Sequence, residues 1–168
     1  SGCSIEDTQM VEGNPSYDFA LAVERIRAAA SAARALGRPF MLCARADGVM
    51  NGQYDLEEGL RRIRAFAEAG ADLVYVPVPG VPDALARVVA ATDRPVNALA
   101  AGALARLSVA ALAALGVRRI STGSMIARLT HSAIADALDA MFVAGNFSPF
   151  ATAASGARIN AMLEKGAG

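Results

Sequence analysis

The sequence has little of several residue types that particular functions require. It has no tryptophan, one histidine and two cysteines among 168 residues, which excludes a disulfide framework and a cysteine-ligated metal centre. Its 16 basic and 16 acidic residues balance without a basic block, so the charge gives no footprint for nucleic acid or an anionic membrane. No apolar run reaches membrane-spanning length without a charge or a helix breaker. We therefore expect no nucleic-acid partner and no membrane partner.

The two cysteines, Cys3 and Cys43, both lie within apolar runs. Buried free thiols are typical of a reducing compartment, so we expect two core thiols and a cytoplasmic protein. The N-terminus has no basic segment followed by an apolar one, as a secretory signal would have. Ser1 is not an initiator methionine, and we expect the chain to be processed or to be part of a longer protein.

The sequence is 54% hydrophobic, and its short apolar runs alternate with longer helical patterns. We expect strands at residues 3–5, 40–44, 72–78, 95–99 and 117–121. We expect helices at residues 19–36, 56–69, 82–91, 109–115, 125–144 and 149–163, with Ser108 as an N-cap. This alternation predicts an α/β fold with a parallel sheet. Periodicity leaves open whether the sheet is doubly wound or belongs to a barrel, which needs eight units and about 250 residues.

Five motifs at the ends of these strands and helices distinguish the two folds. They are Gly2-Cys3-Ser4-Ile5-Glu6-Asp7, Ala44-Arg45-Ala46-Asp47, Ala69-Gly70-Ala71-Asp72, Pro95-Val96-Asn97, and Gly116-Val117-Arg118-Arg119-Ile120-Ser121 with Gly123. In this order they resemble the signatures of the isocitrate lyase / phosphoenolpyruvate mutase superfamily. The resemblance implies a (β/α)8 TIM barrel, with residues 1–168 as a single partial-barrel domain. The chain would represent strand four to the C-terminus, about the last five βα units plus C-terminal helices, without the first three units.

Two carboxylates, Glu6 and Asp7, close the first expected strand. A carboxylate at the end of a buried strand is costly unless it binds something, and Mg2+ takes carboxylate oxygens. The resemblance implies that Glu6 helps to hold Mg2+, with Mn2+ as the alternative ion, and we assign Asp7 to the same metal site. The alternative is that these carboxylates cap a loop or pair with a nearby arginine.

Arg45 follows a wholly apolar strand, where a guanidinium can grip a carboxylate or phosphonate in bidentate fashion. The resemblance implies that Arg45 is the catalytic residue that contacts the substrate and stabilises developing negative charge. The alternative, which is compatible with this role, is an internal salt bridge with Glu6, Asp7 or Asp47. We interpret Asp47 as a loop cap or an arginine partner.

Four further residues are candidates for substrate binding. Asn97 and Ser121 stand near the ends of later strands, where they resemble polar residues lining the pocket of the superfamily. Gly123 lies in the turn after Ser121, where backbone N–H groups at the start of a helix can bind an anion. Asn14 falls eight residues after Glu6, at a spacing similar to that of a gating-loop asparagine in the mutase branch. The alternatives are turn-forming amides and a capping hydroxyl.

Three departures from the superfamily pattern limit the expected activity. The loop after Asp7 has no cysteine, lysine or histidine, whereas the lyase branch carries an acid–base cysteine there. The acid–base position after the third expected strand falls at or near Pro77, and proline cannot transfer a proton. The family's metal-binding aspartate pair belongs to the units that precede this chain.

Two functions of different classes follow from these observations. The first is a Mg2+-dependent enzyme that acts on a small 2-oxo or 2-hydroxy carboxylic acid or phosphonate, and makes or breaks a C–C or P–C bond through an enolate-like or oxocarboxylate species. Because the loop lacks its cysteine, a hydrolase or mutase-like member fits better than isocitrate lyase. The second is a non-catalytic barrel or barrel fragment that binds an anion or a partner subunit. We also expect a homo-oligomer, a tetramer or dimer, because open sheet edges pair and the superfamily swaps its last helices between neighbours.

Overall fold

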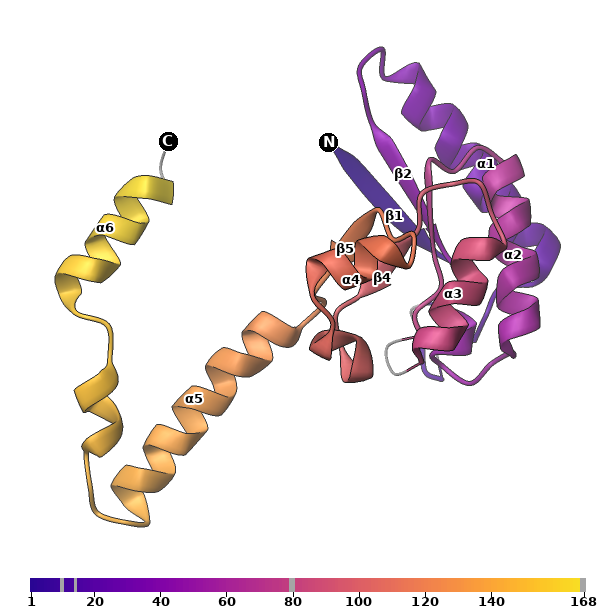
Figure 1. Cartoon of the computed structure of the whole chain (residues 1–168). Coiled ribbons are helices and arrows are strands. Elements are labelled where there is room, and N and C mark those ends of the chain that lie inside the picture. The colour runs from indigo at the N-terminus through magenta and orange to yellow at the C-terminus, as the bar shows by residue number, and fades with distance from the viewer. Residues whose placement is uncertain (10, 14, 79–80, 167–168) are drawn as a thin grey trace. The chain divides into compact units, whose positions relative to one another are not determined.

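The computed structural model describes residues 1–9, 11–13, 15–78 and 81–166 (Figure 1). The chain divides into two compact units, Ser1–Gly123 and Ser124–Gly168. The strands and the candidate site residues belong to the first unit, and each unit is described by itself.

The strands of the first unit are β1 (Gly2–Glu6), β2 (Met41–Arg45), β3 (Leu73–Tyr75), β4 (Asn97–Leu99) and β5 (Arg119–Ser121). β1, β2 and β3 form one parallel sheet in that order, and β4 pairs with β5 in parallel. A parallel bridge between Val74 and Val96 sets β3 beside β4. Each strand therefore neighbours the one that follows it in the sequence. This confirms the predicted α/β fold with parallel strands.

Helices connect the strands: α1 (Phe19–Ala35), α2 (Leu56–Glu68), α3 (Pro82–Ala90) and α4 (Val109–Ala114). The side chains of Asp18, Asp55 and Ser108 accept hydrogen bonds from N–H groups of the first turns of α1, α2 and α4, which confirms Ser108 as an N-cap. Each of these helices ends one residue before its predicted C-terminus. Two short 3-10 helices, η1 (Asp47–Val49) and η2 (Gly102–Arg106), are not predicted by the sequence patterns.

The predicted strand at 72–78 is shorter in the structure, because pairing on β3 ends at Tyr75. Pro77 lies two residues further on and has no backbone N–H to donate to a neighbouring strand. The chain then enters α3 at Pro82, in the first turn of a helix, where proline is tolerated.

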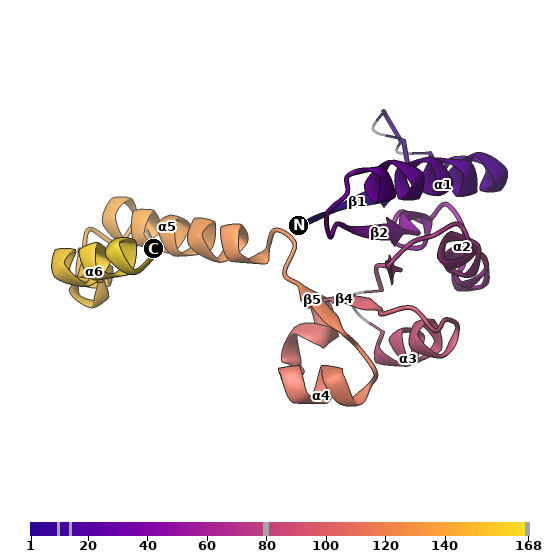
Figure 2. The same ribbon diagram turned by 90° about the horizontal axis from the view of Figure 1, so that it is seen from above.

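One face of the strands packs against the helices, and Figure 2 shows α1 to α4 on one side of the curved row of strands. Leu42 and Ala44 of β2 and Val74 of β3 are buried there together with Ile63 and Phe66 of α2. Their burial removes apolar surface from water and is the main stabilising contribution to this unit. The helices thereby hold the strand ends in fixed positions.

The opposite face of the strands carries a smaller cluster of Cys43, Leu73 and Tyr75, with Leu99 packed against it. Because side chains alternate along a strand, Arg45 projects from the same face as Cys43. Cys43 is buried as predicted, but Cys3 is exposed, so the prediction of two core thiols is wrong for Cys3. Its strand, β1, stands at the edge of the three-stranded sheet, where fewer neighbours cover it.

The second unit consists of α5 (Met125–Phe142), η3 (Ser148–Thr152) and α6 (Gly156–Gly166). The prediction of one helix at 149–163 is wrong, because a 3-10 turn and a separate helix occupy this range. Ala153 is extended, with ψ 145°, and Ser155 Oγ accepts a hydrogen bond from the Arg158 N–H at 3.3 Å, which caps the new helix. Within the described ranges, none of the helices is long and apolar enough to cross a membrane.

Candidate active site

Charged and polar side chains gather at the carboxyl ends of the parallel strands. The register sets Glu6 opposite Arg45 and Arg45 opposite Tyr75, so these residues stand side by side on β1, β2 and β3. On the next two strands, Ser121 ends β5, whereas Asn97 and Arg119 lie opposite each other as the first residues of β4 and β5. The carboxyl ends of parallel strands are where α/β proteins bind their ligands.

Arg45 stands at the centre of this group. Its Nη1 lies 2.8 Å from Glu6 Oε1, and it binds Asp47 through Nε to Oδ1 at 3.1 Å and Nη2 to Oδ2 at 2.8 Å. Its guanidinium carbon lies 5.1 Å from the centre of the Tyr75 ring. Burial opposes the charge, but the hydrogen bond and charge of Asp47 and the charge of Glu6 outweigh it and raise the pKa of Arg45. The internal salt bridge predicted for Arg45 is therefore present with Glu6 and Asp47.

Asp47 pairs with Arg45, as expected from the sequence. The pKa of its carboxyl is also raised. Burial raises the pKa of its carboxyl to about 6, while Arg45 opposes this rise and the Glu6 carboxylate adds to it. A residue pattern does not reveal that a loop carboxylate is buried, so sequence reasoning missed the shift. Carboxyl groups that titrate near neutrality are concentrated at functional sites.

Asn97 and Ser121, both predicted to line the pocket, are brought together by β4 and β5. Asn97 is fully buried, and its Nδ2 donates a hydrogen bond to Ser121 Oγ at 3.0 Å. Its Oδ1 accepts one from Arg119 Nη1 at 3.0 Å, so both ends of the amide are held. Arg119 was not singled out from the sequence, although it shares a face of β5 with Ser121. Gly123 has a φ of 52°, and a Cβ there would lie 3.1 Å from Leu99 Cδ1, so a side chain would be strained.

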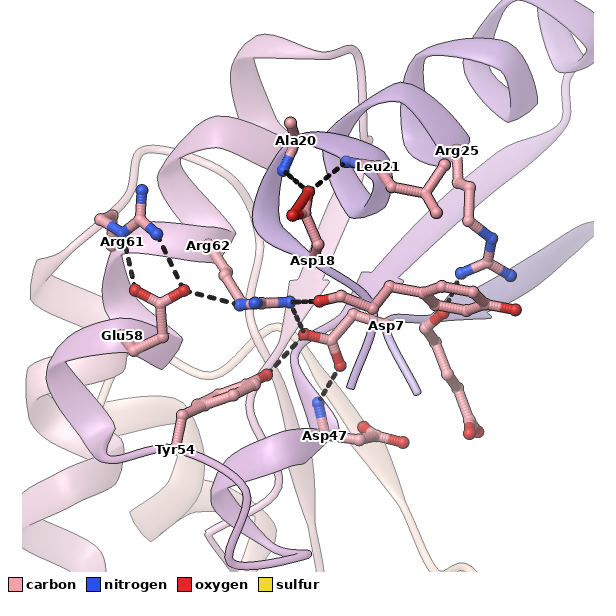
Figure 3. A network of polar contacts seen from close by, with 12 residues as sticks. Asp7, Asp18, Ala20, Leu21, Arg25, Asp47, Tyr54, Glu58, Arg61 and Arg62 are labelled. Carbon is pink, nitrogen blue, oxygen red and sulfur yellow. Dashed lines mark hydrogen bonds and ion pairs between the residues drawn. The ribbon is translucent and has the colours of Figure 1, made fainter. Parts of the chain in front are cut away.

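The Asp7 carboxylate binds Tyr54, Arg62 and the backbone of Asp47 rather than the Arg45 side chain (Figure 3). Its Oδ2 accepts hydrogen bonds from Tyr54 Oη at 2.5 Å and Arg62 Nη1 at 3.0 Å, and its Oδ1 accepts one from the Asp47 N–H at 2.8 Å. Neighbouring residues of an extended chain point to opposite faces, which accounts for the different partners of the Glu6 and Asp7 carboxylates. Of the alternatives left open by the sequence, the structure shows pairing with an arginine. Metal binding by Asp7 stays a prediction.

Of the two carboxylates that bind Arg45, that of Glu6 is accessible to a metal ion and that of Asp47 is buried. Across these residues, no group of three or more histidine, cysteine, aspartate or glutamate side chains could hold a metal ion. The Glu6 side chain is 31% exposed and can give one oxygen to a hard cation such as Mg2+. The site therefore fits a metal as part of a larger donor set. Asn14, predicted to bind substrate, lies outside the described residues.

Pro77, which stands at or near the acid–base position expected from the resemblance, is buried just beyond β3. The Cys43 thiol on the same side of β2 as Arg45 does not replace it. Burial raises the pKa of Cys43 to about 11, against the opposing charges of Arg119 and Arg45, so the thiol stays protonated and unreactive near neutral pH.

Comparison with known proteins relates this arrangement to a family. The family model of phosphoenolpyruvate phosphomutase matches residues 1–142. The crystal structure of a candidate lyase/mutase from Burkholderia cenocepacia J2315 is similar with a TM-score of 0.89 and 40% identity, over 96% of this chain and 58% of that one. The structure of 2,3-dimethylmalate lyase, a PEP mutase/isocitrate lyase superfamily member, is similar with a TM-score of 0.72 and 26% identity, over 87% of this chain and 52% of that one.

Among curated proteins, uncharacterized proteins from two strains of Mycobacterium tuberculosis, CDC 1551 / Oshkosh and ATCC 25618 / H37Rv, are 33% identical over 126 residues. The match covers 74% of this chain and 45% of each relative. The chain thus spans about half the length of the proteins it resembles. All the candidate site residues fall within the range matched by the family model.

Proposed function

The chain belongs to the phosphoenolpyruvate phosphomutase family, and on this basis we propose that the protein is an enzyme acting on a small 2-oxo or 2-hydroxy carboxylic acid or phosphonate. The reaction makes or breaks a C–C or P–C bond beside a carboxylate, through an enolate-like or oxocarboxylate species. The observation that carries this proposal is the cluster of Glu6, Arg45 and Asp47 at the carboxyl ends of β1 and β2. The related 2,3-dimethylmalate lyase, by its name, acts on a small acid of this kind.

We infer that these strands form part of a (β/α)8 barrel, as the last five βα units with C-terminal helices. Each strand neighbours its successor without the reversal of order that marks a doubly wound sheet. The helices of the first unit lie on one side of the strands, as the outer ring of a barrel would (Figure 2). In such a barrel the carboxyl ends of the strands form the catalytic face.

In this proposal Arg45 binds the substrate anion. A guanidinium has five N–H donors, and the contacts with Glu6 and Asp47 leave further N–H groups on Nη1 and Nη2 for a carboxylate or phosphonate. Asp47 holds the guanidinium plane in one orientation by its bidentate contact. The fixed positive charge stabilises negative charge that develops on the substrate during bond cleavage.

Glu6 contributes one carboxylate oxygen to a Mg2+ site, with Mn2+ as the alternative ion. When bound, the ion polarises the carboxylate and keto oxygens of the substrate. Ser121 and Gly123 line the substrate pocket, and the buried Asn97 keeps the pocket wall rigid through its contacts with Arg119 and Ser121. Asn14 keeps its predicted role in substrate binding.

Thermal stability of the intact protein with Mg2+ and oxalate, an enolate mimic, tests this function. A ligand that binds only the folded state stabilises it by about 2.7 kcal/mol at 100 times its Kd, which raises the Tm by about 5 to 10 °C for a protein of this size. We expect wild-type protein to show this rise. Arg45→Ala should abolish it, because the anion loses its cationic partner.

Arg106→Ala, an exposed arginine on η2, is the matched control and should keep the full rise. Equal shifts for Arg45→Ala and wild type would remove Arg45 from the site. A wild-type Tm that does not move with Mg2+ and oxalate would favour the second function, a non-catalytic barrel that binds another anion or a partner subunit. The observation that favours this alternative is Pro77, at or near the acid–base position expected from the resemblance.

A further inference from the structure

The backbone and side chain of Asp7 join the end of β1 to two other segments, the end of β2 with the start of η1 and the stretch before α1. Its N–H donates to the Arg45 carbonyl at 3.1 Å, and its carbonyl accepts from the Tyr17 N–H at 2.8 Å. Its Oδ1 accepts from the Asp47 N–H at 2.8 Å (Figure 3). The side chain is 1% exposed, and a carboxylate so deeply buried is costly unless its oxygens are satisfied. Asp7 therefore fixes the relative positions of these segments.

Arg62 provides the charge partner of Asp7 from α2. Its Nη1 lies 3.0 Å from Asp7 Oδ2 and donates to the Tyr17 carbonyl at 3.0 Å, while its Nε donates to Glu58 Oε1 at 2.8 Å. Its guanidinium carbon lies 4.6 Å from the centre of the Tyr54 ring, whose hydroxyl also binds Asp7. Buried ion pairs often stabilise a fold no more than apolar packing would. We therefore infer that the Asp7–Arg62 pair serves to fix the geometry of the segments it connects.

Asp7 completes the start of η1. The residue before this helix is Ala46, whose side chain cannot accept a hydrogen bond from the helix. Instead, the Asp47 N–H donates to the carboxylate of Asp7, which directly follows β1. Asp47 then holds the Arg45 guanidinium through two hydrogen bonds. A continuous series of contacts thus runs from Arg62 on the helix side to Arg45 on the opposite face.

We propose that Asp7 and Arg62 are positioning residues that fix the guanidinium of Arg45 through Asp47. The inference rests on the proposed function for the ligand that Arg45 binds. Without Arg62, the buried Asp7 carboxylate has no charge partner and its hold on the Asp47 N–H weakens. Asp47 then no longer keeps Arg45 in one orientation. Anion binding weakens although every group that touches the anion is still present.

The orientation of Arg45 can be measured without any ligand. In intact protein labelled with 15N-arginine, the Nε–H resonance of Arg45 is identified by its loss in Arg45→Ala. We expect Arg62→Met to shift and broaden this resonance. Arg61→Met is the matched control on the same helix, because Arg61 also binds Glu58 but is 54% exposed. An Arg45 resonance that is unchanged in Arg62→Met would overturn the proposal.

Binding of oxalate in the presence of Mg2+ provides the second measurement. We expect Arg62→Met to raise the Kd about tenfold, as befits a lost charge-assisted hydrogen bond, and Arg61→Met to change it less than about twofold. In an Arg45→Lys background, Arg62→Met should have little further effect, because a lysine is not held by a bidentate contact. Equal losses in both backgrounds would assign Arg62 a general structural role and contradict the proposal.

Two more variants cover the case in which Arg62→Met does not fold. Arg62→Lys keeps the charge but not the fork of donors, and it should give an affinity between those of wild type and the tenfold loss. Asp7→Asn keeps an acceptor for the Asp47 N–H but removes the charge, and should also shift the Arg45 resonance. If wild type does not bind oxalate, the proposed function fails, whereas the ligand-free resonance still decides whether Arg62 positions Arg45.

Discussion

Asp47 is buried, and its carboxyl lies close to the positive charge of Arg45 and the negative charge of Glu6. Its carboxyl has a pKa of about 6 in the folded protein against an ordinary value of 3.8. Between about pH 4 and pH 6 the folded protein keeps a proton that the unfolded chain releases. The folded state therefore binds more protons in this window, and the contribution of Asp47 to stability falls as the pH rises through it.

Asp47→Asn should remove this pH dependence, because an amide does not titrate. We expect the free energy of unfolding of wild type, relative to that of Asp47→Asn, to fall between about pH 4 and pH 6 and to be level above this range. Urea unfolding at several pH values measures the difference directly. Parallel pH profiles for the two proteins would show that Asp47 titrates normally.

The sequence could identify Glu6 and Arg45 because each follows an apolar run and marks a strand end, and Asn97 and Ser121 because they belong to motifs that resemble those of the superfamily. In the structure Glu6, Arg45 and Ser121 end their strands, whereas Asn97 begins β4 and reaches Ser121 by a hydrogen bond. The orientation of Asp7 was harder to predict, since its partner Arg62 is 55 positions away and no local pattern connects the two. Site geometry that depends on such distant contacts cannot be read from residue spacing.

At the scale of elements, helix starts were predicted from local patterns, although of the three capping residues only Ser108 was identified from the sequence. Asp18, Asp55 and Ser108 each bind N–H groups within three residues of themselves. The break near the C-terminus was not predicted, because Ala153 and Ala154 have high helix propensity. The structure restarts the helix at the capping residue Ser155 instead.

Asp55→Ala should destabilise the first unit through α2. The Asp55 Oδ1 atom accepts the Glu58 N–H at 2.9 Å, and losing an N-cap costs about 1 kcal/mol. For a protein of this size we expect the Tm to fall by about 2 to 4 °C. Asp55→Asn is the control, since an asparagine also caps, and it should stay close to wild type in calorimetry. Equal losses for alanine and asparagine would mean that the charge, not the cap, stabilises the helix.

At the scale of the molecule, the second unit exposes many large apolar side chains within its described residues. Leu129 is 68% exposed, Phe142 79% and Met162 61%, and none of the residues of α5 or α6 is buried. Extended apolar surface of this kind marks interaction sites. We propose that it joins copies of this chain, in the dimer or tetramer expected from the sequence.

Light scattering of the intact protein should therefore give a mass of two or four chains. Phe142→Asp should lower this mass, because a carboxylate in an apolar interface is costly. Ser132→Asp, at an exposed polar position of α5, serves as the control and should leave the mass unchanged. A wild-type mass equal to a single chain would contradict the proposed assembly.

The predictions of fold class, domain extent and cellular location rest on different observations. The α/β class followed from alternating patterns, and the parallel neighbour order of the strands supports it. The single partial-barrel domain stays a prediction, since much of a barrel's closure depends on units that this chain does not contain. The cytoplasmic location also stays a prediction.

The opposite orientations of Glu6 and Asp7 have an evolutionary consequence. Adjacent codons specify the two acids, yet under the proposed function selection would act on Glu6 through metal binding and on Asp7 through its contacts with Arg62 and the Asp47 N–H. A lineage that abandons the reaction can change Glu6 freely, whereas Asp7 must persist as long as Arg62 remains buried opposite it. A descendant that keeps Asp7 but has lost Glu6 would therefore be expected to keep the fold without the activity.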